Sequence, residues 1–559
     1  MAMTGKHGGH AKPFWEDAWD YVKQQNAARL GLVWAAFVFL IAMFAPLIAN
    51  GNPYLVTVLN EAGEPTERYS PLWDTLSAGD IFGIVFGIAC ILAIGLPGNR
   101  GKRLRPLFLA GVQGGASTLF AGIVLDYAIR GDAPQWLVDL RGGSFAREIL
   151  PALVFTVPFF FLALILPIVR SLPERILVAV LVALVVGAGV FHTWGDARTT
   201  YSYRTIAGDI ISYETAVQRG EISIIRAPVP FSPLERYNDR DARNAKPLTT
   251  EDQTLAKRLV ASVRPRVNTI QLSELDKVVA ELQSEDFPLA IDDREAVLAS
   301  FNEWRVGLSD EEAQSLTRSR TEERLSDLLR PYGRLYVLGT NGDGQDVFTH
   351  MIHACRLAIS IGLVSTAIAV TIGIIIGALM GYFGGLMDLL LYRLVEIFQA
   401  IPVLFLLIVA AGVLPRNIYV MMAILGCFGW TGSARFTRAE FLKLRSMDFV
   451  QSCRAVGLPL RSTLFKHMLP NGVTPVLVAS SFAIASAISF EAVLSFLGLG
   501  PVEQASWGRL IAFARAEGLF YWWLAVFPTL AIFLTVLSFV LIGEAFRDAI
   551  DPKRKKARS

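Results

Sequence analysis

Charged residues and cysteines are both scarce in this chain of 559 residues. Asp, Glu, Lys and Arg together make up 18% of it, against about 25% in a typical soluble protein. The 4 cysteines are scattered along the chain, which indicates no disulfide framework. With 53% hydrophobic residues, these shortages exclude a disordered chain, a coiled coil and a disulfide scaffold, and they argue against a wholly soluble protein.

The residues for two kinds of chemistry are also missing. No Gly-x4-Gly-Lys-Ser/Thr phosphate loop occurs, so we expect that the chain does not hydrolyse ATP itself. His350, His353 and Cys355 lie close together, but no full ligand set accompanies them, and we expect no metal site. The net charge of +3 is too small to indicate nucleic acid as a partner.

Long apolar runs, by contrast, are abundant, and the mean hydropathy is +0.45. Several runs reach or approach the length of about 20 residues that spans a bilayer as a helix, which predicts an all-α polytopic membrane protein. The first run is long enough to remain as an anchor, and no cleavable signal pattern precedes it. We predict ten spans, at residues 30–48, 81–96, 107–127, 149–169, 176–191, 357–382, 389–413, 418–430, 473–496 and 519–542.

Lys and Arg in short loops predict the orientation of these spans, because such loops are usually cytoplasmic. Basic residues gather at residues 100–105, in the loop 170–175 and in the segment 431–471. With a cytoplasmic N-terminus and ten crossings, all three loops and the basic C-terminal tail lie on the cytoplasmic side. Three arginines between residues 128 and 148 would lie outside, against the trend.

The longest polar stretch falls on the extracytoplasmic side in this topology. Up to about residue 247 it reads as irregular, whereas from 249 to 329 it predicts short amphipathic helices, with Ala256, Leu259 and Val260 at helical spacing. This helical subdomain is either a spacer or a docking surface. The predicted parts are residues 1–50 with the first span, an extracytoplasmic loop at 51–80, a four-helix membrane block at 81–191, an extracytoplasmic segment at 192–355 containing the subdomain 249–329, a five-span core at 356–552 with the cytoplasmic loop 431–471, and a basic tail at 553–559.

Residues 448–471 end the basic loop with a distinctive pattern. Gly457 allows a sharp reorientation between two short helices, and Pro470 is expected to close the second one. Two short helices joined at a glycine suit insertion into a partner's groove, although an ordinary interfacial helix pair would have a similar composition. The first helix is expected to present one apolar face, formed by Phe449, Val450, Cys453 and Val456.

The same segment resembles the EAA loop of ABC importer permeases, whose pattern is Glu-Ala-Ala, three residues, Gly, nine residues and Ile-x-Leu-Pro. Gly457, Leu469 and Pro470 sit at those spacings, while the Glu-Ala-Ala triplet and the Ile are replaced. In that family the loop docks in a cleft of the ATPase subunit and transmits its opening and closing. The resemblance implies that the joint with an ATPase includes Gln451, Arg454, Ala455, Gly457 and Leu458.

Further motifs narrow the resemblance to the second permease subunit of peptide/nickel-type importers. Residues 48–56 are similar to the branch that takes up peptides and microcin C, and the resemblance as a whole covers residues 28–48 and 336–552. Spans two to five and the segment 249–329 have no counterpart in that subunit. The supporting motifs are Leu338 to Asn341 with Gly344 and Asp346, Arg356, Gly381 to Gly385, Glu491, Ser495 to Gly500, Ser506 to Gly508, and Arg547 to Pro552.

The resemblance implies a type I ABC importer permease core with four additional transmembrane helices and a small extracytoplasmic helical subdomain. It also implies a function: the permease subunit of an ATP-driven, binding-protein-dependent importer of peptides or peptide-like compounds in the bacterial inner membrane. The partners would be a homologous second permease, two ATPase subunits that carry ATP and Mg²⁺, and an extracytoplasmic binding protein; this chain itself would bind no cofactor. The alternatives are a nickel importer of the same fold and, from a different class, a polytopic membrane enzyme, for which no convergent nucleophile, base or metal set is visible.

Two patterns within the predicted core concern packing and polarity. Gly373, Gly377 and Gly381 recur at every fourth residue, which lets a neighbouring helix backbone approach closely. Glu396 and Glu491 lie at or near membrane depth, where a carboxylate usually faces a cavity or a partner. They are candidates for the translocation path or its gate, or they pair with an arginine such as Arg393.

Overall fold

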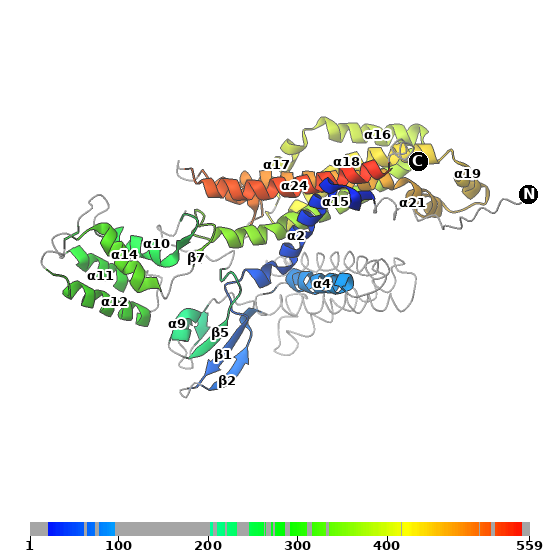
Figure 1. Ribbon diagram of the computed structural model, residues 1–559. Coiled ribbons are helices and arrows are strands. Elements are labelled where there is room, and N and C mark those ends of the chain that lie inside the picture. The colour runs from blue at the N-terminus through cyan, green and yellow to red at the C-terminus, as the bar shows by residue number, and fades with distance from the viewer. Residues whose placement is uncertain are drawn as a thin grey trace, which may run out of the picture. The chain divides into compact units, whose positions relative to one another are not determined.

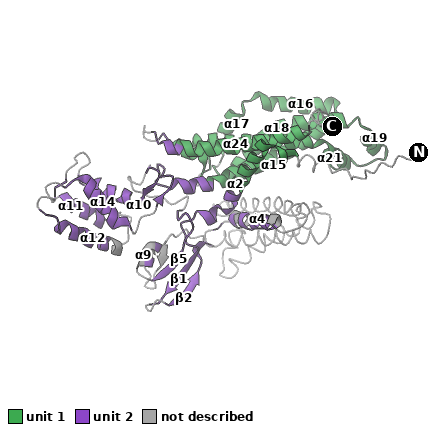
Figure 2. Cartoon of the chain, viewed as in Figure 1, with its two compact units in different colours: residues 1–39, 354–512, 525–559 green, residues 40–353, 513–524 purple. Residues whose placement is uncertain are grey.

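The fold is known from a computed structural model of the chain. Two compact units divide it: residues 1–39, 354–512 and 525–559 form the first, and residues 40–353 and 513–524 form the second (Figure 2). The structure describes residues 21–60, 64–72, 76, 78–95, 202–204, 210–218, 221–231, 245–261, 263, 270–271, 274–284, 291–309, 316–330, 335–414, 416–501, 504–515 and 520–550.

The first unit is built from helices, several of which are long and apolar (Figure 1). Helices α2, α15, α23 and α24 also run into the second unit. The helices are α2 (Asn26–Ile48), α15 (Val347–Phe383), α16 (Gly385–Ala400), α17 (Val403–Val413), α18 (Ile418–Leu444), α19 (Asp448–Ala455), α20 (Leu460–Ser462), α21 (Leu469–Gly472), α22 (Thr474–Phe496), α23 (Trp507–Phe513) and α24 (Trp522–Ile550), with a π-helical turn η3 (Thr463–Met468) between α20 and α21.

Within the described residues, α2, α15, α22 and α24 are each long and apolar enough to cross a membrane. The pair α16 and α17 makes a fifth candidate if the two helices form one span. The prediction of a mainly helical polytopic membrane protein is therefore confirmed. The expected spans at residues 107–127, 149–169 and 176–191 lie outside the described residues.

The span predicted at residues 389–413 is divided between two helices. α16 and α17 are bent by 79° at the break between them. Ile401 takes an extended conformation, with φ −88° and ψ 124°. Pro402 explains this, because proline disfavours the helical conformation of the preceding residue and has no N–H to donate to the helix.

The second unit contains small sheets, which the expectation of an irregular segment did not include. The larger sheet has the order β2-β1-β5, and both of its pairs are antiparallel. Val56 and Ile222 are buried beneath it with Tyr213 of α9 (Tyr213–Gln218). The strands are β1 (Leu55–Leu59), β2 (Pro65–Tyr69), β3 (Ser202–Arg204), β4 (Ile210–Ser212), β5 (Ile222–Ile225), β6 (Thr249–Thr250) and β7 (Leu335–Tyr336); β3 pairs with β4, and β6 with β7.

A helical bundle with its own apolar core occupies part of the predicted subdomain. Its helices are α10 (Glu251–Ala261), α11 (Leu275–Gln283), α12 (Ile291–Val306) and α14 (Arg318–Leu329). Leu259, Leu282 and Phe301 are completely buried in the shared core. Another helix of this unit, α4 (Ala78–Gly95), packs through Gly87 against Met43 and Phe44 of α2. That the bundle lies outside the cell remains a prediction.

A close helix contact of the first unit is between α15 and α18. A Cβ atom added at Gly373 would lie 2.5 Å from the Cβ of Ser433, and one added at Gly381 would lie 2.5 Å from the Cβ of Phe441. Gly377 lies against the backbone carbonyl oxygen of Ala434. The three glycines therefore form a stripe along which the two backbones meet.

Gly377→Val should destabilise this helix pair, because the added side chain would strike the backbone of α18. Overpacking of this kind typically costs about 1–3 kcal/mol, which thermal unfolding of the detergent-solubilised protein would report as a lower midpoint. Gly412→Val in α17 is the matched control, since nothing lies within 4 Å of its Cβ position. Equal midpoints for the two variants would contradict the close packing.

Candidate functional site

Helices α19 and α20, with the π turn η3 that follows them, form an elbow around Gly457. Gly457 has a φ of +71°, and nothing lies within 4 Å of its Cβ position. Its N–H donates to the carbonyl of Arg454, and the N–H of Leu458 donates to the carbonyl of Cys453, each at 3.0 Å. This pair of bonds is a Schellman motif, which requires the left-handed conformation that glycine adopts without strain.

The inner side of the elbow packs against α18. Val450, Leu464 and Met468 are buried in one cluster with Phe441 and Leu444. The elbow is therefore attached to the same helix that the glycine stripe holds against α15.

The expected apolar face of α19 is wrong at one position. Val450 and Cys453 are buried, but Val456 is 78% exposed. Val456 is the C-cap of α19, so the chain leaves the helical path there and turns at Gly457. Helical spacing therefore predicts the buried face of α19 only as far as the end of that helix.

The closing role expected for Pro470 is also wrong. The helical path continues through α21, where Pro470 stands at the start. In the preceding π turn the N–H of Leu469 donates to the carbonyl of Leu464, five residues back. A widened turn of this kind relieves the conflict between the proline ring and the carbonyls of the preceding turn.

All five residues expected at a joint with an ATPase are exposed on the elbow. They are Gln451, Arg454, Ala455, Gly457 and Leu458. Exposed apolar side chains accompany them, since Val456, Leu460 and Phe465 are 78%, 39% and 42% exposed. A surface that combines exposed apolar groups with basic residues is typical of a binding site for another protein.

Two arginines connect this region to neighbouring helices. The Arg454 guanidinium lies over the ring of Tyr382 at the end of α15, 4.7 Å from its centroid. Arg438 of α18 donates to both carboxylate oxygens of Asp388 in α16, at 2.5 and 2.7 Å. Its guanidinium also lies 4.7 Å from the ring centroid of Tyr392. Bidentate pairs of this type fix orientation as well as distance.

The two candidate membrane carboxylates have different surroundings. Glu396 accepts a hydrogen bond of 2.6 Å from Arg393 on the surface of α16. Glu491 is 1% exposed, and its Oε1 accepts hydrogen bonds from Ser495 at 2.7 Å and Ser506 at 2.8 Å. Glu491 thus connects α22 to the segment that leads into α23, a role that sequence reasoning missed.

The motif at residues 338–346, just before α15, owes its residue types to the turn that it forms. Gly339 and Gly344 have φ values of +78° and +75°. Thr340 Oγ1 accepts from the backbone N–H of Ala245 at 2.7 Å, and Asp346 accepts from the N–H of Thr349 at 2.7 Å. The motif forms a tight turn that caps the helix.

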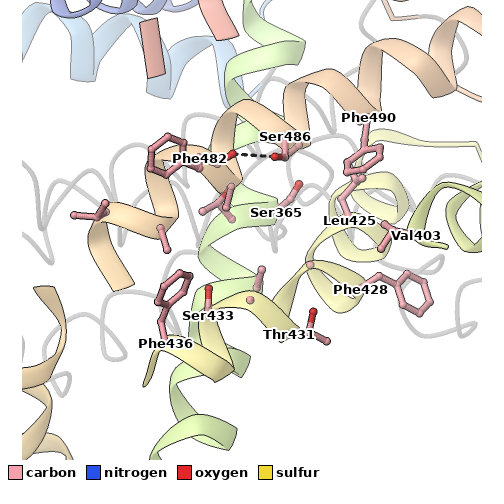
Figure 3. A pocket seen from close by; sticks show the side chains of 18 of the residues that line it. Ser365, Val403, Leu425, Phe428, Thr431, Ser433, Phe436, Phe482, Ser486 and Phe490 are labelled. Atoms are coloured by element: carbon pink, nitrogen blue, oxygen red, sulfur yellow. Dashed lines mark hydrogen bonds between the residues drawn. The ribbon is translucent and has the colours of Figure 1, made fainter. Parts of the chain in front are cut away.

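A cavity of about 720 Å³ lies among the helices of the first unit (Figure 3). Four phenylalanines line it, Phe428 and Phe436 from α18 and Phe482 and Phe490 from α22. Neither Glu396 nor Glu491 belongs to its lining. No local pattern of residues could have signalled this cavity, because its walls combine side chains from five helices.

The comparisons with known proteins place these apolar spans and the elbow in the class of membrane transport permeases. Residues 373–556 match the family of binding-protein-dependent transport system inner membrane components. Residues 13–67 match the N-terminal transmembrane domain of oligopeptide transport permease C.

Three relatives from different bacteria are similar to this chain over about two fifths of its length. The oligopeptide transport system permease protein OppC of Haemophilus influenzae is 36% identical over 219 residues, which make up 39% of this chain and 70% of the relative's length. The peptidoglycan transport system permease protein YejE of Agrobacterium fabrum is 38% identical over 40% of this chain and 58% of its own. OppC of Bacillus subtilis is 32% identical over 43% of this chain and 79% of its own length.

The chain therefore belongs to the inner membrane components of binding-protein-dependent transport systems. It is an ABC transporter permease and not an enzyme. Residues 68–372 lie between the two family matches. That residues 81–191 and 249–329, which fall within this region, are inserted segments remains a prediction.

Glu491→Ala should destabilise the protein, because the Ser495 and Ser506 hydroxyls would lose their buried acceptor. An unsatisfied buried group costs about 1–3 kcal/mol. Glu396→Ala is the control, since an exposed ion pair contributes only about 0–1 kcal/mol. Thermal unfolding in detergent should show a lower midpoint for Glu491→Ala alone, and indistinguishable midpoints would contradict the anchoring role.

Proposed function

We propose that this chain is one permease subunit of an ATP-driven, binding-protein-dependent importer of peptides or peptide-like compounds. The main support is the exposed elbow, which turns at Gly457 and packs against α18, the helix that lies against the glycine stripe of α15. The names of the relatives, which refer to oligopeptides and peptidoglycan, favour peptides over nickel as cargo.

The elbow would couple the membrane helices to an ATPase. A homologous second permease and two ATPase subunits would complete the membrane complex, and the ATPases would carry ATP and Mg²⁺. When they close, the exposed face containing Arg454 and Leu458 would move with them. The buried face would pass that motion to α18, and the Tyr382 stack would pass it to α15, so that the path opens alternately to each side.

The remaining assignments complete this proposal. An extracytoplasmic binding protein would deliver the cargo, and both termini would be cytoplasmic. The helical bundle of α10, α11, α12 and α14 would then face the binding protein's side, as a spacer or as a docking surface.

Gly457→Val should uncouple nucleotide hydrolysis from uptake. Valine at a φ of +71° is strained, so the Schellman turn would rearrange and the elbow would lose its shape. In proteoliposomes containing the complete complex, peptide uptake per ATP hydrolysed should fall about fivefold or more. The coupling free energy between two sites is typically about 1–3 kcal/mol, and losing it corresponds to a change of at least that size.

Gly412→Val, a glycine substitution in open space, should leave this ratio unchanged. Normal uptake by assembled Gly457→Val complexes would count against the elbow as the coupling element. Absence of peptide uptake by the unmodified complex would refute peptides as the cargo.

Arg454→Glu should also lower uptake per ATP, because the stack on Tyr382 needs a cation. Tyr382→Leu should produce the same defect, whereas Tyr382→Phe keeps the aromatic face and should behave like the unmodified protein. The measurement is again uptake and ATPase activity in the same vesicles. A defect with Arg454→Glu but none with Tyr382→Leu would show that Arg454 acts only on the partner subunit.

A further inference from the structure

The cavity of the first unit has the size and lining of a ligand site. Its volume of about 720 Å³ falls within the range of about 300–1,000 Å³ that is usual for small-molecule pockets. The aromatic side chains come from α18 and α22, and Figure 3 shows Phe436 and Phe482 on the two sides of the space. Phe482 also lies close to Gly543 of α24, 3.2 Å from its Cβ position, so this wall rests on a third helix.

One polar group of the lining is unsatisfied. Thr366 is 5% exposed, and its hydroxyl has no hydrogen-bond partner among the described residues. The neighbouring hydroxyls differ: Ser365 donates to the carbonyl of Ile361 at 2.5 Å, and Ser486 donates to that of Phe482 at 3.0 Å (Figure 3). Buried hydroxyls nearly always have a partner, so Thr366 is placed to bond a group that enters the cavity.

The charge of the lining has one sign. Among the described residues that line the cavity, Arg547 is the one charged side chain, and no carboxylate accompanies it there. An anionic group is therefore favoured over a cationic one. Aromatic walls, one available hydroxyl and one cation together match a short peptide that has a large apolar side chain and a free carboxylate.

We propose that this cavity is a substrate-selecting site, in which the phenylalanines hold an aromatic or large apolar peptide side chain and Thr366 bonds the peptide backbone. This inference rests on the proposed peptide function. It adds a selection step by the permease itself, separate from any selection by a binding protein.

The test compares two peptides, Ala-Phe-Ala and Ala-Ala-Ala, in proteoliposomes containing the complete complex. Phe482→Ala should lower the uptake efficiency of Ala-Phe-Ala about tenfold relative to Ala-Ala-Ala, because discrimination in an apolar pocket is of that order. Phe405→Ala is the matched control, since Phe405 is 67% exposed on α17 and does not line the cavity. It should leave the ratio unchanged.

The hydroxyl is tested in the same way. Thr366→Val keeps the shape of the side chain and should lower the uptake of both peptides about fivefold, the lower end of the loss expected for a missing hydrogen bond. Ser365→Ala, whose hydroxyl bonds within its own helix, should change neither. Direct occupancy is measured by crosslinking a tripeptide that carries benzoylphenylalanine at its centre, which should label α18 or α22 and be displaced by Ala-Phe-Ala.

The outcomes separate the two proposals. If the unmodified complex imports neither peptide, the proposed function fails. If it imports both, but Phe482→Ala leaves their ratio unchanged and the crosslink is absent, the selecting site fails while the peptide function stands. A lipid chain or a helix of the second permease in the cavity would give this second result.

Discussion

The close backbone contact between α15 and α18 is the constraint on which the other features of the first unit depend. It is possible only because Gly373, Gly377 and Gly381 present no side chains to Ser433, Ala434 and Phe441. Phe441 is itself part of the cluster that buries Val450 and Met468 of the elbow. The same two helices contribute Ser365 and Thr366, and Phe428 and Phe436, to the cavity. The elbow and the cavity therefore share one support, and under the proposed function a displacement of the elbow would reach the cavity through the closely packed backbones of α15 and α18.

Under the proposed function, polar contacts would determine the direction of that transmission. Arg438 fixes α18 to Asp388 of α16 through two short hydrogen bonds, whereas the exposed Arg454 touches the half-buried Tyr382 through a single stack. A bidentate pair resists rotation, while a cation over a ring face permits sliding at little cost. Under the proposed function, α18 would move with α16 as one body, and α15 would follow the elbow through a softer link.

Local chemistry explains which features the sequence could predict. The spacing of the three glycines predicted a close helix contact, and Gly457 predicted the turn, because both depend on a single residue type at a fixed position. The bend at Pro402, the exposure of Val456 and the π turn before Pro470 were missed, although each lies at a proline or a helix end where the helical pattern stops applying. The pairing of β1 with β5 brings together residues more than 160 positions apart (Val56 and Ile224), and no local pattern encodes that. The cavity was unpredictable for the same reason, since five helices form its walls.

Helix α22 combines an anchored end with a surface that faces the cavity. Glu491 holds its last turns to Ser506, and Arg416 donates to the carbonyl of Gly498 at 3.0 Å just beyond it. Phe490 and Phe482 line the cavity, and the first residues of α22 adjoin α21, whose Gly472 lies against Leu444 of α18. Under the proposed function, a helix fixed at one end and joined to the elbow at the other would respond to elbow motion by pivoting about the Glu491 end. Phe482, farther from that pivot than Phe490, would then move more, so the part of the cavity nearest the elbow would change shape first.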